Sequence, residues 1–222
     1  MDVTFFRERR GGPELALENA VVAWIGAHFR QANSSRLWAG GSVPVGAGMP
    51  DILVATYRPQ LFDCSSLDTC SLQVLAYIRS VRRARLETIS QRIHQPAVRV
   101  ARSIERLLEM HALAREANCL VVTSAWQSIL PEIVAIEAKV SNWKRGLAQA
   151  RRNLLFAHKS FVALPAKTAK RLKADPQFSE RGIGVLGIDA TNAVSILRKG
   201  RRATPSVWTY YYQIAAYIVR SC

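Results

Sequence analysis

Two apolar segments of this chain each place charged residues at one end of a predicted buried β-strand. In the first segment, Asp51 directly precedes the apolar run 52–55. In the second, Glu137 and Lys139 close the run that begins at Ile133. An unpaired charge held against buried strands costs several kcal/mol. Charged residues at these positions therefore indicate a functional site.

The alternation of strand side chains decides which of these residues can meet. Glu137 and Lys139 are two residues apart and share a face, whereas Ala138 points to the other face. If the two strands pair antiparallel, Asp51 lies beside both. Two converging carboxylates repel each other unless a cation lies between them, and an all-oxygen site suits Mg²⁺, with Mn²⁺ as a substitute.

The pairs Pro50-Asp51 and Glu137-Ala138-Lys139 resemble the motifs of the PD-(D/E)xK nuclease superfamily. The expected order of elements, over residues 13–64 and 130–198, is also similar to that of this superfamily. The resemblance implies an α/β fold with a restriction-endonuclease-like core, in which helices flank a mixed central sheet. It implies a metal held by Asp51, Glu137 and the backbone carbonyl of Ala138.

The first helix is expected from Pro13 to about Arg30, because Pro is favoured at the first helical position and apolar residues recur at helical spacing. Many members of the superfamily carry a metal-binding acid on this helix. By resemblance, Glu18 is the candidate for that catalytic and metal-binding acid. Glu14 is the alternative.

A second helix is expected over 142–157, followed by a buried strand over 160–165 and an edge hairpin formed by 184–188 and 193–197. Arg145, Gln149 and Arg152 fall along one side of this helix. Members of the superfamily also carry Gln and basic residues on the helix next to the strand that ends in the motif lysine. The resemblance implies that Gln149 serves catalysis and that Arg145 and Arg152 bind the DNA backbone.

The chain between Asp51 and Glu137 is far longer than the superfamily core requires. We therefore expect an inserted domain over 65–128, which divides the nuclease core into 1–64 and 129–222. The insertion is expected to contain three helices and then a hairpin, at 72–78, 86–93, 96–110 and 114–122. This order resembles a winged helix-turn-helix domain.

The third of these helices would enter the DNA major groove. The residues expected outside its apolar stripe are Arg99, Arg102, Ser103 and Arg106. Arginine is suited to bidentate contacts with phosphate or guanine. A solvated helix face without a partner and a dimerisation module are the alternative interpretations.

Composition favours a polyanionic partner, because 31 Lys and Arg residues against 16 Asp and Glu give a formal charge of +15. No run approaches the ~20 apolar residues of a membrane span. The longest candidate, 207–219, is expected to be a C-terminal helix on the nuclease core. The four cysteines lack the spacing of a zinc site, and the absence of a secretory signal favours a cytoplasmic location.

These observations predict a Mg²⁺-dependent endonuclease that hydrolyses double-stranded DNA, with a restriction or defence role and site selection by the winged helix. Lys139 is expected to position the attacking water or help to deprotonate it, with a pKa lowered by burial and by the metal. The alternatives are a repair or recombination nuclease, a non-catalytic DNA-binding regulator and an RNA-directed nuclease. Cutting both strands would favour a homodimer.

Overall fold

The computed structural model describes residues 3–8, 11–29, 35–46, 48–58 and 67–221. The chain forms two compact units. The first comprises Met1–Thr56 and Glu132–Ser206, and the second comprises Tyr57–Pro131 and Val207–Cys222. The first segment of the second unit thus lies between the two segments of the first unit, and its second segment is C-terminal; the sequence analysis places the insertion at 65–128. The expected boundary at 64–65 lies outside the described residues.

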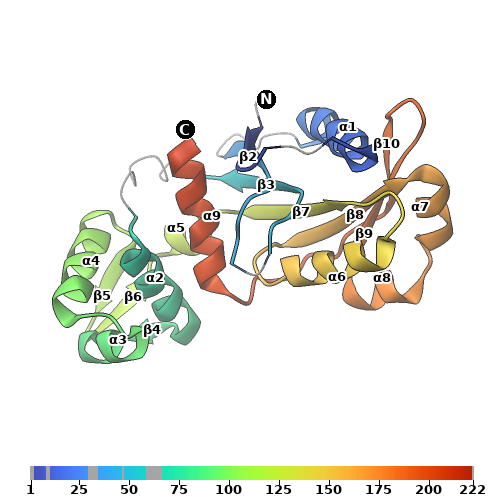
Figure 1. Ribbon diagram of the computed structural model, residues 1–222. Helices are drawn as coiled ribbons and strands as arrows, with labels where there is room; N and C mark the ends of the chain where they lie inside the picture. The colour runs from blue at the N-terminus through green and yellow to red at the C-terminus, as the bar shows by residue number, and fades with distance from the viewer. Residues whose placement is uncertain (1–2, 9–10, 30–34, 47, 59–66, 222) are drawn as a thin grey trace. The chain divides into compact units, whose positions relative to one another are not determined.

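A seven-stranded mixed sheet forms the centre of the first unit, in the order β1-β2-β3-β7-β8-β9-β10 (Figure 1). Its strands are β1 (Thr4–Phe5), β2 (Arg36–Gly41), β3 (Ile52–Tyr57), β7 (Glu132–Ala138), β8 (Lys159–Pro165), β9 (Gly184–Ile188) and β10 (Val194–Arg198). Strand β7 is parallel to β8 and antiparallel to β3, with Ile52 opposite Ile136. The antiparallel pairing expected for the two motif strands is therefore confirmed.

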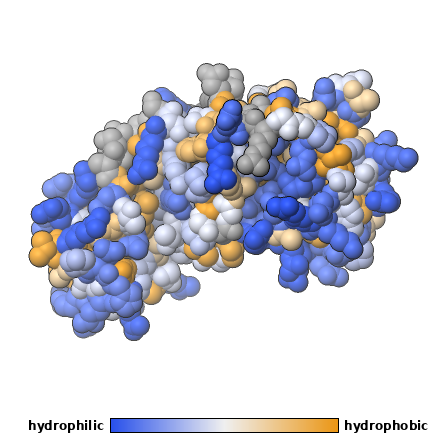
Figure 2. All heavy atoms as spheres, viewed as in Figure 1, coloured by the Kyte–Doolittle hydropathy of each residue, from blue (hydrophilic) through white to orange (hydrophobic). Residues whose placement is uncertain are grey.

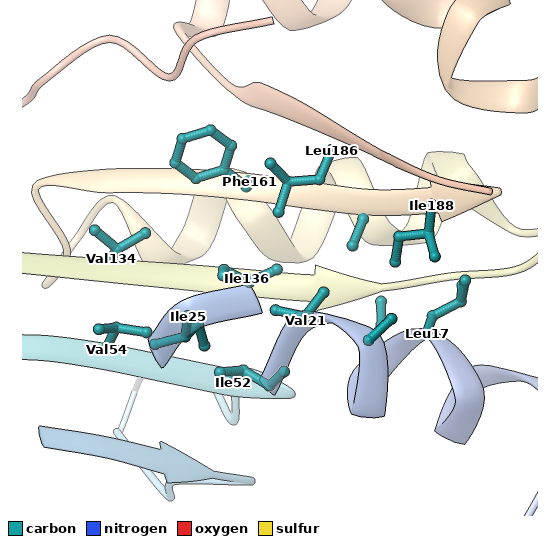
Figure 3. Close-up of a cluster of buried hydrophobic side chains, with 13 residues drawn as sticks. Leu17, Val21, Ile25, Ile52, Val54, Val134, Ile136, Phe161, Leu186 and Ile188 are labelled. Carbon is teal, nitrogen blue, oxygen red and sulfur yellow. The ribbon is translucent and has the colours of Figure 1, made fainter. Parts of the chain in front are cut away.

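Helices cover both faces of this sheet, which gives the first unit an α/β architecture in three layers. Helix α1 (Pro13–His28) lies on one face, and α6 (Trp143–Asn153), α7 (Ala166–Leu172) and α8 (Pro176–Arg181) belong to the other. Figure 3 shows Val21 and Ile25 of α1 packed with strand residues that include Ile136. Both faces are buried, which explains why β7 and β8 are apolar almost throughout.

Alternation along β8 confirms this layering. Phe161 and Ala163 belong to the cluster that contains α1, whereas Val162 and Leu164 belong to the cluster that contains α6, α7 and α8. In β7, Ile136 and Ala138 belong to the α1 cluster. Glu137 lies between them in sequence and therefore points to the α6 face.

The second unit is mostly helical and carries a small antiparallel sheet in the order β4-β6-β5. Its elements are α2 (Thr69–Val81), β4 (Arg83–Ala84), α3 (Leu86–Ile93), α4 (Ala97–Glu109), β5 (Leu113–Glu116), β6 (Cys119–Val122), α5 (Ser124–Gln127) and α9 (Trp208–Ser221). Helix α2 packs against α3, α4 and α9. The three predicted helices and the hairpin are therefore present.

Helix α9, expected from the sequence to belong to the core of the first unit, instead belongs to the second unit and packs on α2. The guanidinium carbon of Arg79 lies 3.7 Å from the centre of the Trp208 ring. The Tyr211 hydroxyl donates to the Leu130 carbonyl at 3.1 Å and accepts from the Leu130 amide at 2.9 Å. The apolar stripe of this helix predicts burial but does not identify the unit against which it packs. Within the described part of the chain, no helix combines the length and apolarity needed to cross a membrane.

Candidate active site

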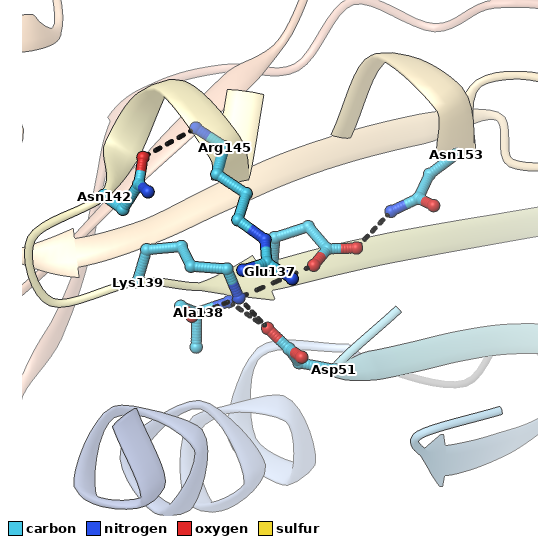
Figure 4. A network of polar contacts seen from close by, with 7 residues as sticks. All are labelled: Asp51, Glu137, Ala138, Lys139, Asn142, Arg145 and Asn153. Atoms are coloured by element: carbon cyan, nitrogen blue, oxygen red, sulfur yellow. Dashed lines mark hydrogen bonds and ion pairs between the residues drawn. The ribbon is translucent and has the colours of Figure 1, made fainter. Parts of the chain in front are cut away.

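The antiparallel pairing of β3 and β7 brings Asp51, just before β3, to the end of β7. Asp51 Oδ2 accepts two hydrogen bonds there, from the Ala138 amide at 2.8 Å and from Lys139 Nζ at 2.9 Å (Figure 4). The predicted meeting of Asp51 with the Glu137 strand is therefore observed. The backbone amide fixes the position of the carboxylate, and the ammonium group compensates its charge.

The ammonium group of Lys139 is the point on which the oxygens of this site converge. Besides Asp51, Nζ donates to the Ala138 carbonyl at 2.8 Å, and it lies 3.8 Å from Glu137 Oε2. The Lys139 side chain is only 8% exposed. Three oxygens proposed from sequence as metal ligands thus face one buried positive charge.

The Glu137 side chain is 1% exposed and is held by a residue that the sequence did not single out. Asn153, at the end of α6, donates from Nδ2 to Glu137 Oε1 at 2.8 Å. The other carboxylate oxygen, Oε2, is buried and accepts no hydrogen bond within the described residues. One half of this carboxylate is therefore positioned by the protein, and the other half is left for a further group.

Burial and the two neighbouring charges shift the pKa values of this site. Burial, followed by the negative charge of Asp51, raises the pKa of Glu137 to about 8, although Asn153 and Lys139 oppose the shift. Burial alone would lower the pKa of Lys139, but the carboxylates of Asp51, Glu137 and Glu14 together raise it. The lowered Lys139 pKa expected from the sequence is that of a lysine beside a bound metal and stays a prediction, because the raised pKa belongs to the metal-free chain.

Helix α6 reaches the site because it has no side chain at Gly146. A Cβ atom placed there would lie 2.8 Å from Lys139 Cγ and 3.1 Å from Val162 Cγ1. The side chain of Asn142 caps the start of this helix by accepting from the Arg145 amide at 3.1 Å. Gly146 therefore lies over Lys139, and Asn153, two turns further on, lies over Glu137.

The two acids of α1 line a cleft together with Asp51. Glu14 and Glu18 border an open cleft of ≈ 1010 Å³, whose walls also include Ser42 and Met49. Glu14 is exposed and Glu18 is half-exposed. Glu14, first taken as the alternative, is one of the acids whose negative charge raises the pKa of Lys139, after Asp51 and Glu137.

The donor set fits a magnesium ion better than a metal held by protein ligands alone. Within the described residues, no group of three His, Cys, Asp or Glu side chains could hold a metal ion. Mg²⁺ is usually bound through one or two carboxylates, with waters and substrate phosphates completing its shell. The observation that supports such an ion is Glu137 Oε2, which is buried, accepts no hydrogen bond in the described chain and lies 3.8 Å from Lys139 Nζ.

Compared with protein-family models, curated proteins and solved structures, the chain matches none. The positions and contacts of the site residues are therefore the basis for a functional proposal.

Helix α6 carries the remaining predicted residues of the first unit. Arg145 and Arg152 are exposed, and among the described residues no hydrogen bond or ion pair joins either side chain to Asp51, Glu137 or Lys139. Gln149 is half-buried, and its Oε1 atom is buried without a hydrogen-bond partner in the described chain. Gln149 lies three residues after Gly146 and four before Asn153, and this spacing places it on the side of α6 that faces the site.

On α4 of the second unit, the structure separates the predicted contact residues. Arg99, Arg102 and Arg106 are exposed, whereas Ser103 is only 5% exposed and belongs to the buried side of the helix. The prediction that Ser103 lies outside the apolar stripe is therefore wrong. Ser103 occupies a stripe position between Val100 and Leu107, because its side chain is small enough to be buried there.

Replacing Asn153 by alanine is expected to weaken binding of a metal ion at this site about 10- to 100-fold, the range seen when a residue that orients a metal ligand is removed. Glu137 would lose the hydrogen bond that fixes Oε1. Titration with Mn²⁺, followed by electron paramagnetic resonance, measures the metal dependence of binding and tests this.

The matched control is Asn142→Ala, which makes the same change on the same helix but removes only the helix cap. It is expected to lower stability by about 1 kcal/mol without changing the metal dependence. Equal metal dependence of the two variants would contradict the role assigned to Asn153.

Proposed function

We propose that this protein is a Mg²⁺-dependent DNA endonuclease whose phosphodiesterase site is formed by Asp51, Glu137 and Lys139. The observation that carries the proposal is the convergence of two carboxylates and the Ala138 carbonyl on one buried cationic group. A buried acid and a buried lysine beside a second, partly buried acid are costly for stability. A catalytic role explains why the chain bears this cost.

The finer fold assignment supports the same function. We propose a restriction-endonuclease-like core, supported by the β3-β7-β8 pairing, with α1 and α6 on opposite faces. For the second unit we propose a winged helix-turn-helix, supported by the order α2-β4-α3-α4-β5-β6. In that assignment α4 is the recognition helix and the β5-β6 hairpin is the wing.

Asp51, Glu137 and the Ala138 carbonyl would hold the Mg²⁺ ion, and Mn²⁺ could replace it. When bound, such an ion activates water and neutralises charge on the phosphoryl oxygens. Lys139 would orient that water or help to deprotonate it, and would offset charge on a phosphate oxygen. Asn153 holds Glu137 in place, and Glu14 or Glu18 adds negative charge on the opposite wall of the cleft.

Removing one carboxylate tests the metal site without measuring activity. Glu137→Gln keeps an oxygen for Asn153 but removes the negative charge, so Mn²⁺ affinity is expected to fall at least about 10-fold. Mn²⁺ titration followed by electron paramagnetic resonance measures this affinity directly.

Glu132→Gln is the matched control, because Glu132 begins the same strand but pairs with Lys159 at 2.7 Å and Arg202 at 3.0 Å. This variant is expected to bind Mn²⁺ as the wild type does. If Glu137→Gln also binds Mn²⁺ like the wild type, Glu137 is not a ligand.

The exposed residues of α4 support DNA recognition by the second unit. Arg99 reaches Asp68 only at 3.6 Å, and both side chains are largely exposed, so this ion pair contributes little and leaves Arg99 available. Val98, in the first turn of the helix, is 74% exposed. An exposed apolar side chain among arginines is suited to contact a thymine methyl group, a feature that the sequence analysis did not pick out.

Replacing Arg99 and Arg102 by glutamine is expected to weaken binding to duplex DNA. A bidentate arginine contact contributes about 1–3 kcal/mol, so we expect a loss of at least ~10-fold in affinity. Fluorescence anisotropy with a labelled duplex measures it, and Arg220→Gln, an exposed arginine on α9, is the control. Unchanged affinity in the double variant would favour the dimerisation or solvated-face interpretation of α4.

A further inference from the structure

A basic groove lies in the first unit, on the outer side of α6. It has a volume of ≈ 820 Å³, and four arginines line it: Arg151, Arg152, Arg181 and Arg201. Glu180 is the one acidic residue among its lining residues, and Leu155 forms part of its apolar surface. Figure 2 shows hydrophilic residues gathered over α6 and α8, the helices that supply three of these arginines.

None of the four guanidinium groups has a salt-bridge or hydrogen-bond partner among the residues that the structure describes. Glu180, although it borders the same groove, forms no ion pair with them in the described chain. Clustered like charges without counter-charges repel one another and lower stability. The groove therefore has the electrostatic character of a site that receives an anion from outside the chain.

The groove also has a defined position relative to the candidate active site. Arg152 directly precedes Asn153, whose side chain donates to Glu137 Oε1 at 2.8 Å. The last turn of α6 thus carries a groove residue on its outer side and a residue of the site on its buried side. Arg201 is fixed by its backbone, since its amide donates to the Gly182 carbonyl at 2.8 Å.

The alternative explanation is local, because Arg151, Arg152 and Arg181 lie in the last turns of α6 and α8. Basic residues at helix C-termini stabilise the helix through its dipole. This accounts for arginines at helix ends, but it does not account for Arg201, which follows β10 and is not part of a helix. Nor does it account for four cations lining one groove.

We propose that this groove binds the phosphate backbone of double-stranded DNA as a second, sequence-independent contact surface, separate from α4. The proposal rests on the proposed nuclease function. No aromatic residue is among those that line the groove, so it lacks the stacking surfaces on which single-stranded nucleic acids are bound. Arginine contacts to phosphates hold a duplex in register but do not read its sequence.

The test is the salt dependence of duplex binding by the quadruple variant Arg151→Gln/Arg152→Gln/Arg181→Gln/Arg201→Gln. Each phosphate contact adds about 0.9 to the slope of log affinity against log salt, so the slope is expected to fall by about 2–4 and affinity by at least ~10-fold. The loss is expected to be equal for duplexes of unrelated sequence. Binding is measured in EDTA, so the result does not depend on cleavage.

The control variant is Lys167→Gln/Lys170→Gln/Arg171→Gln/Lys173→Gln, which removes the same formal charge from the α7 region of the same unit. Equal slopes for the two quadruple variants would overturn the proposal, because net charge alone would then explain binding. Tighter retention of single-stranded DNA or RNA than of the duplex would overturn the choice of ligand. Because Arg201 packs on Gly182, the triple variant that retains Arg201 separates lost binding from lost folding.

Failure of the groove proposal can be distinguished from failure of the nuclease proposal. If the groove variant loses duplex affinity while the wild type never cleaves DNA, the groove is a DNA-binding surface on a protein without nuclease activity. If the wild type cleaves DNA and the groove variant binds it normally, only the groove proposal fails.

Discussion

Replacing Lys139 by alanine is expected to abolish DNA cleavage, with a loss of at least about 100-fold, while duplex binding stays nearly unchanged. The ammonium group is buried, donates to Asp51 and the Ala138 carbonyl, and is the charged donor that would meet a phosphate oxygen. The exposed surfaces that we propose to bind DNA lie on other residues. Cleavage of plasmid and anisotropy of a labelled duplex, measured on the same preparations, separate the two activities.

The Lys139→Ala variant is also expected to be less stable, because removal of Lys139 leaves two carboxylates without their shared cation. Breaking a buried ion pair by removing one partner costs about 3–5 kcal/mol. Lys139→Met keeps most of the apolar stem and is the second variant to test. Lys159→Ala, on the neighbouring strand β8, removes a lysine that pairs with Glu132 and is expected to cleave normally. Parallel loss of binding and cleavage in a folded Lys139 variant would contradict the assignment.

Replacing Gly146 by alanine is expected to reduce cleavage at least about 10-fold, since small displacements of catalytic groups have effects of this size. The new Cβ atom would lie 2.8 Å from Lys139 Cγ, so α6 or the lysine must move. Crowding a buried site in this way costs about 1–3 kcal/mol. Alanine has a higher helix propensity than glycine, which offsets up to about 1 kcal/mol of this destabilisation. We therefore expect a net destabilisation in thermal unfolding.

Gly26→Ala is the matched control, because Gly26 lies within α1 and has no atom within 4 Å of an added Cβ. This variant is expected to be more stable than the wild type by about 0.5–1 kcal/mol and to cleave normally. The two glycine variants should thus change stability in opposite directions. An active and stabilised Gly146→Ala variant would show that α6 does not constrain Lys139.

Strands β3, β7, β8, β9 and β10 and three residues of the candidate site could be predicted because their signals are local, whereas β1 and β2 were not predicted. Asp51, Glu137 and Lys139 are charged residues at the ends of apolar runs, and strand alternation determines their faces. Asn153 has no such signal. Its contact with Glu137 depends on how α6 lies across β7, which the sequence of α6 alone does not determine.

Other misses have physical causes of the same kind. The sequence analysis predicts no element over 167–173, yet Ala169 and Leu172 of helix α7 pack in the core on one face of the sheet. Ser103 was assigned to the exposed side of α4 because serine is polar, although its position belongs to the buried stripe. The pKa of Lys139 depends on three acids from separate elements, one of them Glu14, which sequence spacing does not bring together.

Cleavage of supercoiled plasmid by the wild type and by Asp51→Ala, compared side by side, tests the central claim most directly. Each protein is incubated with Mg²⁺, with Mn²⁺ and with EDTA, at low and moderate salt. Nicking or linearisation that requires the metal and disappears in the variant is the predicted result. Wild-type protein that binds the plasmid in every condition but never cuts it would contradict the nuclease function and favour a DNA-binding regulator. Cleavage that persists in EDTA or in Asp51→Ala would contradict the metal site.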